Sequence, residues 1–156
     1  SAASDVYKRQ VYNDIGEIYS VQGDDFKALD YFKKSLKIVL SVYGENHSQV
    51  SSIYDHIGEI YFAQKDYSKA LYYFEESLKI RLSLFGENHP EVALSYYSIG
   101  SLYIIQGDKS KALNYYEKSL KIRLSVYGEN HPLTKEIMDL INVANSKVLQ
   151  SPETTK

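Results

Sequence analysis

The sequence contains no cysteine and no tryptophan, and it has only three prolines and one methionine. The absence of cysteine excludes disulfides, thiolate metal ligands and a cysteine nucleophile. No apolar run approaches the roughly 20 residues that a helix needs to cross a membrane. A dominant charge is also lacking, because a formal net charge of -2 gives the whole chain no attraction to nucleic acid or to anionic membranes.

What the sequence does have is a phrase that returns three times, as YGENHS, FGENHP and YGENHP. The glycines of the three copies, Gly44, Gly86 and Gly128, are 42 residues apart each time. A fixed period of this length is typical of stacked repeats, in which each unit contacts only its neighbours. The core should be rich in tyrosine, since the chain has 16 tyrosines and only 5 phenylalanines.

Each repeat contains two helical periods. In the first helix of the third repeat, one face carries residues at i, i+3, i+4 and i+7, namely Tyr96, Ile99, Gly100 and Tyr103. A glycine in mid-helix costs about 1 kcal/mol relative to alanine, so we expect another helix to pack very close to Gly100.

The segment between the two helices carries a stop signal and a start signal. Gly107 can take the left-handed conformation that ends the first helix, and Asp108 can cap the second. The middle repeat has Lys65 at the glycine position. A lysine in this conformation costs roughly 1 kcal/mol, so we expect a local weakness there.

The recurring GENHP phrase reads as a connection between repeats. Gly86 ends a second helix, Pro90 suits the first turn of the next helix, and His89 should be extended because it precedes proline. The alternative is that His47, His89 and His131 bind a metal or act as bases. A repeat width of about 10 Å separates them, so a shared zinc ion is implausible, and we expect capping and no metal site.

These residues resemble a known family. The pattern of Tyr96, Ile99, Gly100, Tyr103, Ala112, Tyr116 and Ser119 resembles the tetratricopeptide repeat, and the 42-residue length with GENHP is similar to its kinesin-light-chain type. The resemblance implies an all-α fold, a right-handed superhelical stack of antiparallel helix pairs with about three repeats and a C-terminal capping helix. HEAT or armadillo repeats fit the period but lack these signature positions.

The chain ends depart from the repeat. The first ten residues, SAASDVYKRQ, resemble a translated sequencing adapter, so we expect a non-native segment and a natural chain cut at its N-terminus. After Pro132 the pattern becomes that of a cap, with Ile137, Leu140, Ile141 and Val148 available to cover the third repeat. The expected segments are a non-native 1–10, a repeat array 11–150 with units at about 8–46, 47–88 and 89–130, a cap helix 132–150 and a flexible tail 151–156.

The resemblance implies that the first helices line a concave groove that binds peptides or protein segments. The groove-facing candidates are Asn13, Asp14, Glu17, Asp55, His56, Glu59, Leu94, Tyr97, Ser98, Ser101 and Ile105. Kinesin light chains hold peptide backbones with asparagines in this region, and most of these asparagines are missing here. Chaperone-binding relatives grip acidic C-termini with lysine, arginine and asparagine, and the candidate surface here has no basic residue apart from His56.

The charges suggest what this groove prefers. Between Val11 and Gln22 and again between Ser51 and Gln64, the first helices carry four acids in total and no lysine or arginine. We therefore expect acid on the inner face and base on the outer face, where the second helices place Lys33, Lys34, Lys37, Lys79, Arg81, Lys118, Lys121 and Arg123. A basic or amphipathic segment would fit, with an apolar side chain meeting Tyr97 and Ile105. The plainer alternative is that these charges only solvate helix faces.

Other classes of function have less support. Asp55, His56 and Glu59 could be imagined as an acid-base set, but no nucleophile or phosphate loop accompanies them, so we expect neither catalysis nor a cofactor. Acids dilute the outer lysines, so we expect no nucleic-acid binding. Neither do we expect a membrane partner. We expect a cytoplasmic monomer, with end-to-end association possible at the cut end, and the alternative function is a sensor or regulatory arm of a larger signalling protein.

Overall fold

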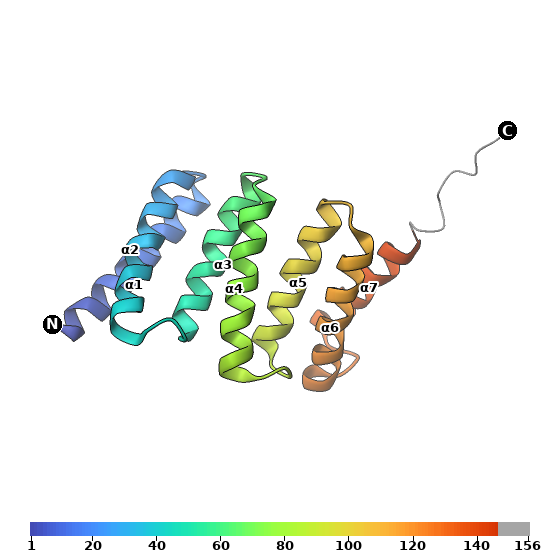
Figure 1. Ribbon diagram of the computed structural model, residues 1–156. Coiled ribbons are helices and arrows are strands. Elements are labelled where there is room, and N and C mark those ends of the chain that lie inside the picture. Colours follow the sequence, from blue (N-terminus) through green and yellow to red (C-terminus); the bar gives the residue numbers. More distant parts are fainter. Residues whose placement is uncertain (147–156) are drawn as a thin grey trace. The chain divides into compact units, whose positions relative to one another are not determined.

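The computed structural model describes residues 1–146, and within them the chain is entirely helical (Figure 1). The helices are α1 (Ala2–Val21), α2 (Asp25–Tyr43), α3 (Ser48–Ala63), α4 (Tyr67–Phe85), α5 (Pro90–Ile105), α6 (Lys109–Tyr127) and α7 (Pro132–Ser146). The expected all-α class with three antiparallel helix pairs and a further C-terminal helix is confirmed. The chain forms two compact units: unit 1 is Ser1–Gly86, with α1 to α4, and unit 2 begins at Glu87, with α5 to α7.

The second helix of each pair starts at an aspartate. Asp108 caps α6 by accepting a hydrogen bond from the backbone N–H of Lys111 at 3.1 Å, as the sequence predicts. Asp24 and Asp66 cap α2 and α4 in the same way. Each bond satisfies a backbone donor that would otherwise lack a partner in the first helical turn.

The residue before each of these caps turns the chain in the left-handed conformation. Gly107 has φ 82° and Lys65 has φ 62°, so the lysine of the middle repeat does adopt the conformation that the neighbouring repeats give to glycine. The expected strain at Lys65 is therefore present in the folded chain.

The mid-helix glycines mark the closest approach of the helices in each pair. A Cβ atom on Gly100 would lie 2.7 Å from the ring of Tyr116, and one on Gly58 would lie 2.7 Å from the ring of Phe74. A Cβ atom on Gly16 would lie 2.9 Å from the ring of Phe32 on α2. The prediction of a close-packed helix at these positions is confirmed.

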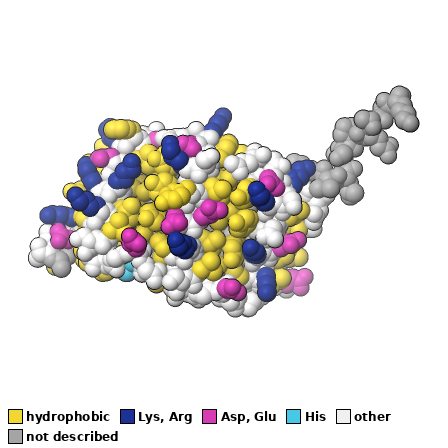
Figure 2. All heavy atoms as spheres, viewed as in Figure 1, with side chains coloured by type: hydrophobic (Ala, Val, Ile, Leu, Met, Phe, Trp, Pro, Cys, Tyr) yellow, Lys and Arg dark blue, Asp and Glu magenta, His cyan; other side chains and the backbone are white. Residues whose placement is uncertain are grey.

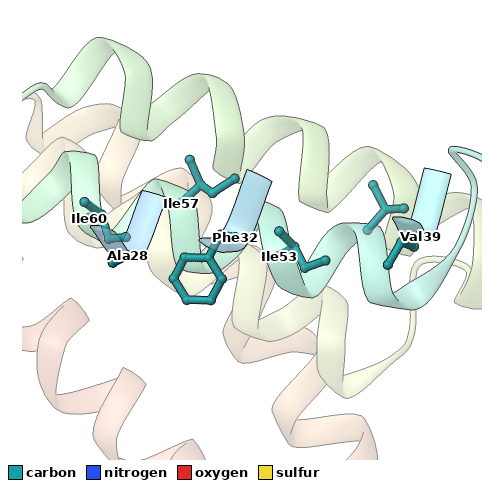
Figure 3. Packing of buried hydrophobic residues seen from close by; sticks show 7 residues of the cluster. Ala28, Phe32, Val39, Ile53, Ile57 and Ile60 are labelled. Carbon is teal, nitrogen blue, oxygen red and sulfur yellow. The ribbon is translucent and has the colours of Figure 1, made fainter. Parts of the chain in front are cut away.

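The buried core of unit 1 lies between α2 and α3 (Figure 3). Its members, each at most 2% exposed, are Ala28, Phe32, Val39, Val50, Ile53, Ile57 and Ile60. Tyrosines surround this core and pack against each other. Tyr61 and Tyr73 stack with centroids 5.7 Å apart, and Lys69 places its ammonium 5.0 Å from the Tyr61 centroid. The hydroxyl-bearing rings thus sit at the rim of the core.

In unit 2, α7 packs on α6 and covers it with apolar side chains. Ile137 and Ala144 are buried, and Leu140 and Ile141 are half-buried, which agrees with the expected cap. Val148, the last residues of the predicted cap helix and the tail 151–156 lie outside the described residues. No described helix is both long enough and apolar enough to span a bilayer.

At the other end of the chain, α1 begins at Ala2, so the ten residues that resemble an adapter continue the helix. The hydroxyl of Ser35 donates to the backbone carbonyl of Arg9 at 3.2 Å, which fixes α2 against this part of α1. On the surface, acidic and basic side chains are interspersed among exposed hydrophobic ones on the face shown in Figure 2.

Candidate functional site

The repeated histidines act as helix caps. His89 is extended, with φ -129° and ψ 142°, and its Nδ1 accepts a hydrogen bond from the backbone N–H of Glu91 at 3.2 Å. His47 and His131 make the same bond, each to the residue two positions further on. The predicted capping role is confirmed for all three. Among the described residues no three His, Asp or Glu side chains converge as a metal site would require.

The first-helix candidates of unit 1 lie close together on α1 and α3. Glu17 lies at their centre, because it accepts a hydrogen bond from the amide of Asn13 at 2.6 Å and lies 3.5 Å from His56 Nε2. His56 Nδ1 is in turn 3.8 Å from Glu59. Asp14, also on α1, accepts a hydrogen bond from the Gln10 amide. The fold thus connects these side chains across two repeats.

His56 is held in place by the core beneath it. Its ring stacks on Phe32 with centroids 5.0 Å apart and an interplanar angle of 6°. The nearby carboxylate of Glu59 raises the pKa of His56, and the charges of Glu17 and Asp55 act in the same direction against the opposing effect of burial. The imidazole is therefore protonated more readily than a free histidine.

Asp55 forms an ion pair with an arginine from the second helix of its own repeat. Arg81 Nη1 lies 2.7 Å from Asp55 Oδ2, and the Arg81 side chain is only 4% exposed. Burial raises the pKa of Asp55, and the neighbouring Arg81 charge opposes that rise. Asp55 therefore adds less negative charge to this surface than its residue type indicates.

The expectation that Arg81 and Arg123 lie on the outer face is wrong. Both side chains are 4% exposed and pack between helices. The Arg81 guanidinium forms an ion pair with Asp55, and that of Arg123 forms one with Glu136. The repeat itself carried a signal for this, because the position reads Val39, Arg81 and Arg123 at 42-residue spacing, and Val39 is fully buried. A long arginine at a core position must direct its charged end to a partner.

In unit 2 the candidates lie around two tyrosines. The guanidinium carbon of Arg123 lies 5.1 Å from the centroid of the Tyr97 ring. The Tyr97 hydroxyl donates a hydrogen bond to Glu136 of α7 at 3.4 Å. Arg123 also pairs with Glu136 at 3.3 Å and donates to the backbone carbonyl of Leu133. These contacts tie the cap helix to the candidate surface. Sequence reasoning missed Glu136, which carries no repeat signal.

The remaining unit 2 candidates are less connected. Ser101 forms a 3.1 Å hydrogen bond with the Tyr116 hydroxyl, and Ser98 is half-buried. Leu94 and Ile105 are 44% and 50% exposed, so both leave apolar surface open to a ligand.

A hollow of about 440 Å³ lies along α1 of unit 1. Asp14 and Glu17 line it together with Ile18, Val21 and Gln22. Ile18 and Val21 are 55% and 90% exposed, so aliphatic surface adjoins two acids here. Sequence reasoning did not include these two residues, although both follow Glu17 within one helical turn.

Comparison with protein families and solved structures places this geometry in context. A family model described as Tetratricopeptide repeat matches residues 7–83 and again residues 49–125. No curated protein matches the sequence.

Several solved structures share the fold. BtubC (BKLC) from P. vanneervenii has 20% identity and a TM-score of 0.74, over 95% of this chain and 67% of that one. A kinesin light chain-like protein of Podosopora anserina with nearly identical TPR-like repeats has 16% identity and a TM-score of 0.75, over 90% and 68%. The apo form of RapI has 19% identity and a TM-score of 0.78 over 92% of this chain, which spans about half of RapI at 50%.

Proposed function

Because the chain belongs to the tetratricopeptide repeat family, we propose that it is a protein-interaction module whose α1 and α3 surface in unit 1 binds a basic, amphipathic peptide segment. We call this surface, formed by Asp14, Glu17, Ile18, Val21 and Glu59, the acidic surface. The observation that carries the proposal is the hollow in which two carboxylates adjoin two exposed aliphatic side chains.

The acidic surface offers both the apolar contacts and the charges that peptide binding needs. A dissociation constant near 1 μM corresponds to about 8 kcal/mol, and one exposed ion pair contributes only about 0 to 1 kcal/mol. Ile18 and Val21 would therefore anchor an apolar side chain of the peptide. Glu17 and Glu59 would select lysine or arginine at the flanking positions of the peptide.

The neighbouring groups favour binding over catalysis. Asp55 pairs with Arg81, whereas Glu17 and Glu59 approach His56 from two helices, so the acid-base set imagined from the sequence is divided between two separate groups of charges. A protonated His56 would reduce the negative charge of the acidic surface, so basic ligands should bind more weakly as the pH falls.

The test compares two labelled peptides with the same apolar residues, one flanked by lysines and one flanked by glutamines. Fluorescence anisotropy with the 156-residue chain should detect binding of the lysine peptide alone, with affinity that falls as salt is added. The Glu17→Gln, Glu59→Gln double variant should weaken binding about tenfold. Glu75→Gln, which removes an exposed acid from α4, is the matched control. Equal binding of both peptides would refute the proposal.

A further inference from the structure

Each unit also has a hollow on the side of a second helix, α4 in unit 1 and α6 in unit 2, and none of the candidates described above lines it. The hollow of unit 1 has a volume of about 430 Å³ and that of unit 2 about 550 Å³. Seven lining positions of the two hollows are related by the 42-residue repeat, and six of them carry the same residue in both hollows. In unit 2 these are Glu87, Asn88, Tyr96, Lys121, Ile122 and Ser125.

The same hydrogen bond shapes both hollows. Asn88, in the turn before α5, donates from Nδ2 to the hydroxyl of Ser125 on α6 at 3.2 Å. In unit 1, Asn46 makes the equivalent bond to Ser83 at 3.1 Å. The turn is thus tied to the second helix of the following pair. Each hollow is therefore a recurring feature of the repeat, and a hydrogen bond fixes the position of its edge.

One substitution between repeats reverses the charge of the hollow. Glu76 lines the hollow of unit 1, where Lys79 lies 3.9 Å from it as an ion pair. The equivalent position in unit 2 is Lys118. With its two acids and one lysine, the unit 1 hollow carries a net charge of -1, whereas two lysines and one acid give the unit 2 hollow +1.

The two lysines of the unit 2 hollow keep their ammonium groups available. Within residues 1–146, neither Lys118 nor Lys121 forms an ion pair with a carboxylate, and both are exposed. The Lys118 ammonium lies 5.5 Å from the ring centroid of Tyr96 and 5.3 Å from that of Tyr115, which positions it at the edge of the hollow. Tyr96 and the buried Ile122 supply an apolar wall beside these cations.

We propose that the unit 2 hollow binds an acidic segment of a partner protein, with a carboxylate at Lys118 and Lys121 and an adjacent apolar side chain against Tyr96 and Ile122. The charge pattern favours a peptide over a nucleic acid, because Glu87 lines the hollow and Glu117 precedes Lys118. A polyphosphate backbone would meet these acids, whereas a short peptide needs only the two lysines. This site belongs to unit 2 and the acidic surface to unit 1, and the two prefer ligands of opposite charge.

The repeat supplies the test variants. The probe is a labelled hexapeptide in which aspartates flank one phenylalanine, and its control has asparagines in place of the aspartates. The aspartate peptide should bind with one site per chain, and Lys118→Glu, which restores the unit 1 charge, should weaken binding about tenfold. Lys135→Glu makes the same change in net charge on α7, outside the hollow, and should leave affinity unchanged.

A gain-of-function variant completes the experiment. Glu76→Lys gives the unit 1 hollow the charge of the unit 2 hollow, so it should raise the stoichiometry from one peptide to two. Circular dichroism would check that each variant remains helical. Equal effects of Lys118→Glu and Lys135→Glu, unchanged stoichiometry with Glu76→Lys, or binding of a single-stranded oligonucleotide that displaces the peptide would each overturn the proposal. Binding of the lysine peptide to the acidic surface is measured separately, so the two proposals fail independently.

Discussion

Arg81 reaches from α4 to Asp55 on α3 with a nitrogen-oxygen distance of 2.7 Å, and the first repeat has Val39 and Asn13 at the two equivalent positions. A charged pair in one repeat thus takes the place of a neutral pair in another. Exchanging the charged pair for the neutral one therefore measures how much the ion pair contributes to the stability of this fold.

Removing one partner of this ion pair should lower the free energy of unfolding more than removing both partners together. Arg81→Val leaves Asp55 without its cation, and Asp55→Asn leaves a buried guanidinium without its anion, so each should lower the free energy of unfolding by about 2 to 3 kcal/mol. The double variant reproduces Val39 and Asn13 and should lose less than either single variant. Urea unfolding of the four proteins measures this, and additive losses would contradict it.

The stability that His56 contributes should depend on pH. Its folded-state pKa is raised above the ordinary value of 6.5, chiefly by the nearby carboxylate of Glu59. The stabilisation is fully present below the unfolded pKa of about 6.5 and is lost as the pH rises through the raised folded value. His56→Gln should remove this part of the pH dependence. Urea unfolding at about pH 6 and pH 8.5 compares the two proteins, and parallel changes in both would contradict the prediction.

A methyl group at Gly58 should destabilise the protein although alanine favours helices. The new Cβ would lie 2.7 Å from the Phe74 ring, and the strain of about 1 to 3 kcal/mol should exceed the propensity gain of about 1 kcal/mol. Thermal unfolding of Gly58→Ala should show a lower midpoint. Combining it with Phe74→Leu, which makes room, should cost less than the sum of the two single changes.

Lys65 should be a site where a single glycine stabilises the chain. Its φ of 62° suits glycine, so Lys65→Gly should raise the free energy of unfolding by about 1 kcal/mol. The reverse change at the equivalent position, Gly107→Lys, should lower it by a similar amount and serves as the matched control. Denaturant midpoints measure both, and a stabilising effect of Gly107→Lys would exclude this explanation.

The features that the sequence predicted correctly depend on short stretches of chain. The His89 cap requires only the backbone N–H two residues on, and the Asp108 cap only the one three residues on. The close approach at Gly100 follows from the cost of a mid-helix glycine. Such features are visible because the residues that interact lie within one turn, or because the repeat shows them three times.

The features that the sequence did not predict depend on what lies opposite in space. Arg81 and Arg123 occupy equivalent positions, yet one pairs with Asp55 and the other stacks on Tyr97 and pairs with Glu136. Their residue type alone suggested an exposed cation. Whether such a side chain folds inward is decided by its partners on another helix, which periodicity does not reveal.

The bond between Asn46 and Ser83 bears on how the chain would respond to a pulling force. Asn46 follows α2 but holds α4, so a load applied at this turn reaches the far helix of the next pair as well as the near one. The turn at Asn46 and the helix pair α3 and α4 should then unfold together under load. From Gly44 to Gly86 such an event would release roughly 140 Å of extended chain, so that a force trace should rise and fall in steps of one repeat.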